Sequence, residues 1–269
     1  MAITSDLLDA FETHSLEEIR AALAKGADPG AVIGGKTPIE RLIEMYTRSS
    51  RFAACLRVML DAGGTLDDAF LEAILLDDAG RLGEILAVSP TEIQRTLHLD
   101  CAYTSLQGVS ALHICAEYNC VECARALLDA GMDVDTRAEL DENGLGGQTP
   151  LFHTVNSNRN HCRPMMELLV EAGAALDIRL KGLRWGRGCE WETTVSDVSP
   201  ISYAQCGLYP QFHRPEQDVY ANIGYLCRHR YGGELRAANV PNKYVDERFD
   251  LGAARRGQQP ESDDHGGAV

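Results

Sequence analysis

Apolar positions recur along this chain in pairs of short helical patterns, and similar residues mark where each pair begins. A hydroxyl residue followed by proline or alanine opens the first pattern of four pairs: Thr37-Pro38-Ile39, Ser110-Ala111-Leu112, Thr149-Pro150-Leu151 and Ser199-Pro200-Ile201. Serine and threonine accept hydrogen bonds from free amides at a helix N-terminus, and proline at the first position lacks an amide that would stay unpaired there. We therefore expect a helix to begin at each of these places.

The second pattern of each pair ends at a glycine, and the four glycines are Gly26, Gly63, Gly131 and Gly173. Glycine readily adopts the left-handed conformation that ends a helix. Gly63 and Gly131 lie 68 residues apart, which is close to two repeats of about 33 residues. A degraded pair is therefore expected between 66 and 105, where residues 68–76 and 81–86 supply two short helical patterns.

Residues 108–135 form the clearest unit, with the sequence GVSALHICAEYNCVECARALLDAGMDVD. Together with the Thr-Pro-Leu opening at 149–151, this unit resembles an ankyrin repeat. The resemblance implies helix pairs that stack on one another, because one repeat cannot bury its apolar face alone. Ala111, Phe152 and Ser202 depart from the Thr-Pro-Leu-His pattern of the family. We expect these departures to weaken the hydrogen bonding between repeats.

The resemblance predicts an all-α fold, an ankyrin-repeat solenoid of about six helix-turn-helix units with an inserted β-hairpin near the C-terminus. The ankyrin-repeat domain is expected to span 1–233, with an N-terminal cap at 3–33 and repeats at 34–66, 67–105, 106–140, 145–180 and 196–233. The repeat pattern fades after Gly232-Gly233, and residues 250–269 are rich in Gly, Asp and Gln, so we expect the tail at 234–269 to be largely disordered.

Two insertions interrupt the repeat. Residues 136–147 lengthen one turn with polar residues, whereas residues 178–195 alternate apolar and polar positions on both sides of a Gly-x-Gly centre. Such alternation around glycines is typical of a β-hairpin. We therefore predict a hairpin at 178–195 that projects from the helical array.

Composition narrows the classes of partner. The 269 residues carry a formal net charge of −15, which argues against non-specific binding to nucleic acid or to an anionic membrane. The first residues show neither a basic leader nor a long apolar run, and the nine cysteines have no disulfide-framework spacing. We expect a cytoplasmic monomer with reduced thiols.

One cluster of potential metal ligands stands out, consisting of His113, Cys115, Cys120 and Cys123. Structural zinc sites use two ligand pairs separated by a dozen or more residues, and no second pair follows here. The histidine and two of the cysteines also match hydrogen-bonding and core positions of the repeat. We expect no metal, no cofactor and no enzymatic activity, because the other thiols likewise lack a base and an orienting group in a recognisable pattern.

Candidate binding residues come from two sources. Ankyrin proteins bind partners through their turn tips and the inward side of the first helix of each repeat. The resemblance therefore implies contacts at exposed positions that correspond to Gln107, Glu117, Tyr118, Gln148 and Asn156.

The predicted hairpin supplies the other candidates, Arg184, Trp185 and Arg187. Tryptophan and arginine are enriched at interface hot spots. The alternative is a hairpin that packs its tryptophans onto the last repeats, and we favour this alternative for Trp191 more than for Trp185.

These observations favour a non-catalytic protein–protein interaction module that binds a protein partner of basic or neutral charge. One alternative is a metal- or thiol-dependent enzyme or sensor that uses the Cys/His cluster. A further alternative is an inhibitor or immunity-type protein.

Overall fold

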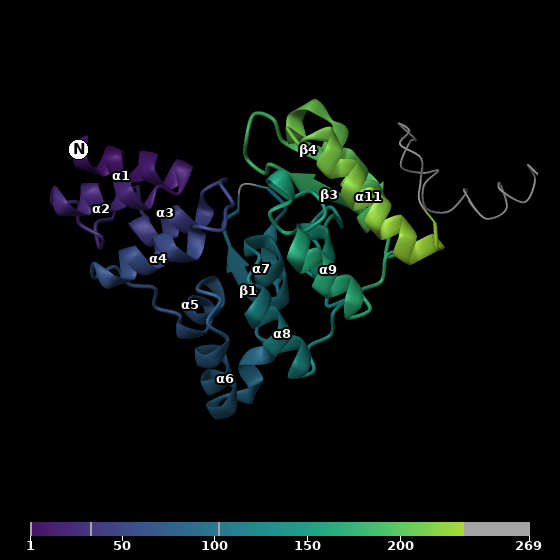
Figure 1. The fold of residues 1–269 in the computed structure, drawn as a ribbon, viewed down its shortest axis with the longest axis horizontal. Coiled ribbons are helices and arrows are strands. Elements are labelled where there is room, and N and C mark those ends of the chain that lie inside the picture. Colours follow the sequence, from purple (N-terminus) through teal and green to yellow (C-terminus); the bar gives the residue numbers. More distant parts are fainter. Residues whose placement is uncertain (1, 33, 102, 234–269) are drawn as a thin grey trace, which may run out of the picture.

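The computed structural model describes residues 2–32, 34–101 and 103–233, and the predicted disordered tail lies outside these residues. Helix pairs follow one another along the described chain (Figure 1). The first three pairs are α1 (Ala2–Thr13) with α2 (Leu16–Ala24), α3 (Pro38–Glu44) with α4 (Phe52–Asp61), and α5 (Ala69–Leu75) with α6 (Ala79–Val88). The helices expected at 68–76 and 81–86 are α5 and α6, so this prediction is confirmed.

The later elements are less regular. A 3-10 helix η1 (Pro90–Gln94) precedes α7 (Ala111–Tyr118) and α8 (Val121–Asp129), and the next helices are η2 (Pro150–His153), η3 (Asn158–Asn160) and α9 (Arg163–Glu171). The last are α10 (Pro200–Gln205), η4 (Cys206–Leu208), η5 (Pro210–Phe212) and α11 (Glu216–Tyr231). Thr149-Pro150 thus opens only one 3-10 turn, because the following Thr-Val-Asn-Ser-Asn run contains poor helix formers.

The four helix-ending glycines behave as the sequence predicts. Gly26, Gly63, Gly131 and Gly173 all have φ between 89° and 99°. In each case the following amide donates to a carbonyl five residues earlier, for example Met132 N to Leu127 O at 3.0 Å. This is the 6→1 bond of the Schellman motif. The same local device therefore ends α2, α4, α8 and α9.

The helices stack in two rows. In one row α1 contacts α3, α5 contacts α7, α7 contacts η2, and η2 contacts α10. In the other row α2 contacts α4, α6 contacts α8, and α8 contacts α9. A continuous core runs between the rows, and it includes Phe11, Leu42, Leu112 and Met166, each with an exposed fraction of 0%. These contacts bury apolar helix faces between neighbouring pairs, as stacked repeats require.

The predicted all-α class is wrong. Of the described residues, 52% are helical and 10% are in strands, and these strands form two small antiparallel sheets. The strands β1 (Leu97–Leu99) and β2 (Leu106–Val109) pair in one sheet, while β3 (Leu180–Trp185) and β4 (Thr193–Val198) pair in the other. The second sheet is the predicted hairpin, which begins and ends slightly later than expected. The first was missed because its strands are too short for a clear alternation.

Three turns lie side by side along one edge of the helical array. Glu139 N donates to Gly108 O at 2.9 Å, and Gly146 N donates to Gly182 O at 2.9 Å. The insertion at 136–147 thus bridges β2 on one side and β3 on the other. Gly108 is essential to this contact, since it has φ +63° and an added Cβ would lie 2.4 Å from Glu139 Cβ. We call the β1–β2 ribbon, the 138–147 turn and the β3–β4 hairpin the turn row.

Candidate functional site

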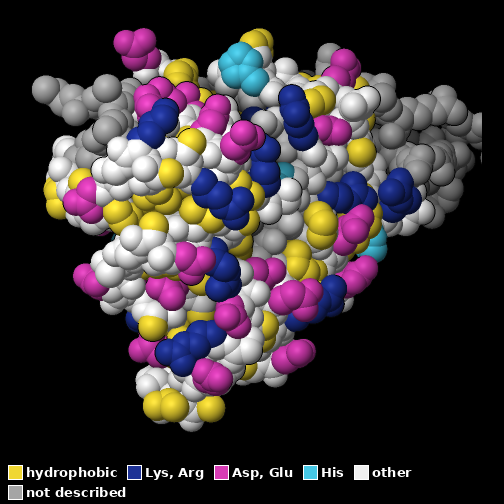
Figure 2. Space-filling view, turned by 60° about the vertical axis from the view of Figure 1, so that its left-hand side comes forward, with side chains coloured by type: hydrophobic (Ala, Val, Ile, Leu, Met, Phe, Trp, Pro, Cys, Tyr) yellow, Lys and Arg dark blue, Asp and Glu magenta, His cyan; other side chains and the backbone are white. Residues whose placement is uncertain are grey.

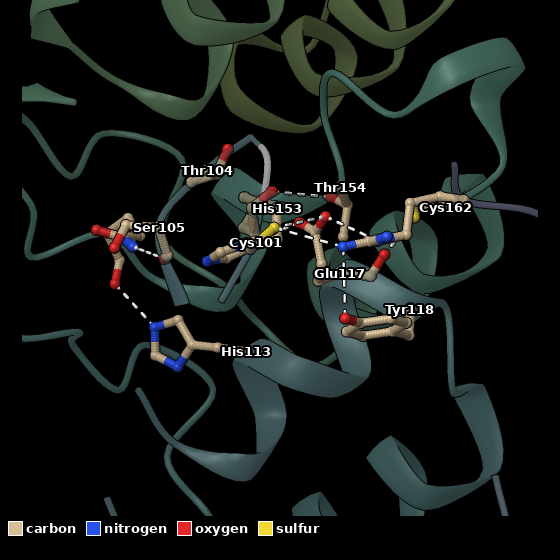
Figure 3. A network of polar contacts seen from close by, with 12 residues as sticks. Cys101, Thr104, Ser105, His113, Glu117, Tyr118, His153, Thr154 and Cys162 are labelled. Atoms are coloured by element: carbon tan, nitrogen blue, oxygen red, sulfur yellow. Dashed lines mark hydrogen bonds and ion pairs between the residues drawn. The ribbon is translucent and has the colours of Figure 1, made fainter. Parts of the chain in front are cut away.

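A buried ion cluster lies where the turn row covers the C-terminal end of α7. Glu117, on the last turn of α7, accepts from Arg48 Nε at 3.1 Å and from His153 Nδ1 at 3.0 Å. The side chains of Glu117 and Arg48 are each only 6% exposed, and the side chain of His153 is 0% exposed. Figure 3 shows Glu117, His153 and Cys101 converging from separate parts of the chain.

Electrostatics keep this glutamate ionised. Burial on its own raises the pKa of a carboxyl group, but the hydrogen bond from His153 and the charge of Arg48 outweigh it. The pKa of Glu117 therefore lies below its ordinary value. Arg48 completes the cluster by donating to Thr47 O at 3.0 Å and by lying over the Tyr118 ring, 4.4 Å from its centroid. The cluster thus joins the loop after α3 to α7 and η2.

The candidate binding residues fall into two groups. The expectation that Glu117, Tyr118, Gln148, Asn156 and Trp185 are exposed is wrong, because the structure buries all five. Gln107 and Arg184 are half-buried, and only Arg187 is exposed.

The reason for this burial is visible at Tyr118. Its hydroxyl donates to Ile43 O at 2.6 Å, and its ring lies 4.7 Å from the Phe52 ring. The loop from Met45 to Ser50 folds over the inward side of α7, which the family resemblance leaves open. A sequence pattern for α7 alone contains no signal for this loop contact.

The hairpin packs onto the last repeats through Trp185, whereas we expected this contact from Trp191. Trp185 is 3% exposed and stacks on Phe212 at a centroid distance of 4.1 Å, whereas Trp191 remains 41% exposed. Tyr103, from the β1–β2 connection, also stacks on Trp185 at a centroid distance of 5.2 Å. Trp185 therefore fixes the hairpin to the last repeats, and Trp191 is the tryptophan that stays accessible.

The Cys/His cluster has structural contacts throughout. His113 accepts from Ser110 N through Nδ1 at 3.2 Å and donates through Nε2 to Gln148 O at 2.9 Å. Burial, followed by the nearby His153, lowers the pKa of His113 to about 3. Burial also raises the pKa of Cys115 and Cys120 well above the ordinary thiol value. Within 2–32, 34–101 and 103–233, no group of three His, Cys, Asp or Glu residues is placed to hold a metal ion.

A groove runs along the turn row. One cavity of about 290 Å³ lies between the turns and is lined by Gln107, Glu139, Asp141, Glu142, Gln148 and Arg184 among others. A second cavity of about 580 Å³ shares Ser105, Gln107 and Arg187 with the first and continues toward Glu44 and Asp100. We call these two neighbouring cavities the turn groove.

The floor of the turn groove carries an unpaired acceptor. Gln148 is 1% exposed, and its Nε2 donates to Ser105 O at 2.7 Å, which fixes the orientation of the amide. Its Oε1 has no hydrogen-bond partner among the described residues. A buried acceptor without a partner costs free energy until a donor reaches it. The rim supplies the exposed carboxylates Glu139 and Glu142, neither of which pairs with a basic side chain of the described residues.

One face of the molecule is mixed in charge. On the face drawn in Figure 2, Lys and Arg side chains lie between Asp and Glu side chains. The net negative charge is therefore not gathered into one acidic field on that face. Local side chains, not the overall charge, decide what the turn groove can bind.

Stacked helix pairs with turns along one edge define a repeat protein. Residues 85–181 match the family model described as ankyrin repeats (3 copies). Residues 85–181 therefore contain ankyrin repeats, and they include η1, α7, α8 and α9. No curated protein matches the chain. None of the helices in the described part of the chain has the length and apolarity needed to cross a bilayer.

Proposed function

We propose that this protein is a non-catalytic interaction scaffold whose partner docks in the turn groove. Ankyrin repeats generally mediate protein–protein interaction, and the observation that carries the present proposal is the unpaired Oε1 of Gln148 on the groove floor. A partner side chain that donates a hydrogen bond there relieves an existing cost. This hydrogen bond would therefore favour the bound state of the groove.

The rim of the groove favours a basic partner segment. Glu139 and Glu142 are exposed and line the same cavity as Gln148. Asp141 is already engaged, since its carboxylate lies 3.3 Å from Arg184 Nη2. A lysine or arginine side chain can donate to Gln148 Oε1 and pair with a rim carboxylate at the same time.

The thiol-dependent alternative has weaker support. A nucleophilic cysteine needs a thiolate, and burial raises the pKa of Cys162 and Cys206 to about 12. These thiols are therefore protonated near neutral pH, which favours a packing role.

Peptide display tests the proposal. We expect a library of ten-residue peptides selected on the protein to enrich Lys or Arg at one position. Glu142→Lys should weaken the selected peptide by about tenfold, because it places a positive charge on the rim. Asp61→Lys makes the same change of charge on the exposed end of α4 and should leave binding unchanged. Equal binding by wild type and Glu142→Lys would place the interaction elsewhere.

A further inference from the structure

A third, smaller pocket lies against the ion cluster and is separate from the two cavities of the turn groove. Its volume is about 30 Å³, and its walls include Arg48, Glu117, His153, Asn156, Trp185 and Arg214. A space of this size holds one small polar group or one or two water molecules. Exposed Tyr46 and Asn158 also line the pocket, so it opens to solvent beside the loops that follow α3 and η2.

Arg214 is the unusual member of this pocket. Its Nη1 donates to Phe212 O at 2.7 Å and its Nε donates to Asn156 O, so both of these bonds go to main-chain carbonyls. Among the described residues no carboxylate lies within ion-pair distance of its guanidinium group. Burial lowers the pKa of Arg214 below its ordinary value. A cation that loses water without gaining a counter-ion is destabilising, and an anion at the pocket would compensate it.

The one carboxylate in the pocket wall is already occupied. Glu117 already pairs with Arg48 and His153, so its carboxylate does not form an ion pair with Arg214. Two arginines and one glutamate leave the pocket with a net positive charge, in a protein whose formal net charge is −15. The charge of the pocket is therefore positive, whereas the net charge of the protein is negative.

A second unpaired group lies in the same wall. His153 is 5% exposed, and its Nε2 has no hydrogen-bond partner among the described residues, while Nδ1 faces Glu117 Oε2. The side chain of His153 is 0% exposed, and its bond to Glu117 fixes the ring in the pocket wall.

We propose that this pocket binds a carboxylate group, with Arg214 as the residue that contacts it. The small volume admits the carboxylate alone, so the remainder of any larger ligand extends toward Tyr46 and Asn158. The carboxylate can belong to a small free acid or to the C-terminus of a peptide, and both present the same two oxygens. This site is separate from the turn groove, and neither proposal depends on the other.

Fluorescence provides the readout, because the chain has only two tryptophans and Trp185 lines the pocket. Trp191→Phe leaves Trp185 as the sole reporter. Sodium acetate is titrated at constant ionic strength, with acetamide as the neutral analogue. We expect a saturable change with acetate, with a dissociation constant on the order of 1 mM, and no change with acetamide.

Variants assign the response to the pocket. Arg214→Gln in the same background should weaken acetate binding by about tenfold or more, since it removes a charge-assisted contact. Arg125→Gln, on the exposed side of α8, is the matched control and should bind like the parent. Circular dichroism of each variant checks that the fold is retained. If Arg214→Gln does not fold, the acetate and acetamide titrations of the parent protein still decide the matter.

Two peptides distinguish the sources of the carboxylate. Tetra-alanine with a free C-terminus that binds more tightly than acetate, while its C-terminal amide does not bind, identifies a peptide terminus as the ligand. Acetate binding without tetra-alanine binding identifies a small free acid. Identical responses to acetate and acetamide, or no saturable response to acetate and tetra-alanine, would overturn the proposal.

Discussion

Replacing Glu117 by glutamine removes the charge that holds Arg48 and His153 together and keeps the size of the side chain. The Glu117 and Arg48 side chains are each 6% exposed, so solvent does not take over the lost interaction. Breaking a buried ion pair on one side destabilises a protein by about 3–5 kcal/mol, because the remaining charge is left uncompensated. Glutamine still accepts one hydrogen bond, so we expect a loss near the lower end, about 3 kcal/mol.

Urea unfolding followed by circular dichroism at pH 7 measures this loss. A change of this size lowers the unfolding midpoint by about 1 M urea in a chain of this length. Glu84→Gln removes an exposed ion pair with Arg81, in which the glutamate is 69% exposed, and should change stability by less than about 1 kcal/mol. Adding Arg48→Met to Glu117→Gln should recover part of the loss, since no buried charge then remains from the pair.

The contribution of Glu117 also depends on pH. Because its pKa in the folded state lies below the ordinary value, its contribution is complete above the ordinary carboxyl pKa. It is lost as the pH falls through the folded-state pKa. A Glu117→Gln variant within about 1 kcal/mol of wild type at pH 7 would refute the reasoning that the cluster is an energetically coupled buried ion pair.

Three further predictions follow from single features. Burial, with the charges of Arg48 and Arg51, lowers the pKa of His14 to about 4. The unfolded chain therefore binds this proton first, and the free energy of unfolding falls as the pH drops from about 6.5 toward 4. H14N should flatten that part of the stability profile measured by urea unfolding. Gly108→Ala should destabilise the protein by about 1–3 kcal/mol because of its positive φ and its contact with Glu139. Gly83→Ala, in open space within α6, should stabilise it by about 0.5–1 kcal/mol. Thermal unfolding should therefore show a lower midpoint for the first variant and a higher midpoint for the second. A thiol reagent should label half-buried Cys189 first in the native protein, and rapid labelling of Cys115 before unfolding would contradict its assigned burial.

Local features were predictable from the sequence because their causes are local. The capping glycines and the threonine and serine N-caps act within one turn of helix, so Gly26 and Thr37 carry their signal in the residues beside them. The Gly-x-Gly centre of the β3–β4 hairpin is a signal of the same kind. The degraded pair α5 and α6 was found from the repeat interval, which is also a property of the sequence alone.

The candidate site was less predictable because its contacts join distant parts of the chain. Arg48 and Glu117 are 69 residues apart, and the burial of Tyr118 depends on the loop that contains Arg48. Arg214 lies between two loop prolines and shows no periodic pattern that would place it near α7. The β1–β2 ribbon depends on pairing between strands of three and four residues, which local propensity specifies weakly.

Hydrogen exchange of the protein with and without a display-selected peptide locates the binding surface without altering a residue. We expect the peptide to slow amide exchange in the turn row, at residues 105–109, 139–146 and 182–187. Exchange in the outer helices α4, α6 and α8 should not change. Protection confined to those outer helices, with unchanged exchange along the turn row, would contradict the proposal that this protein binds its partner through the turn groove.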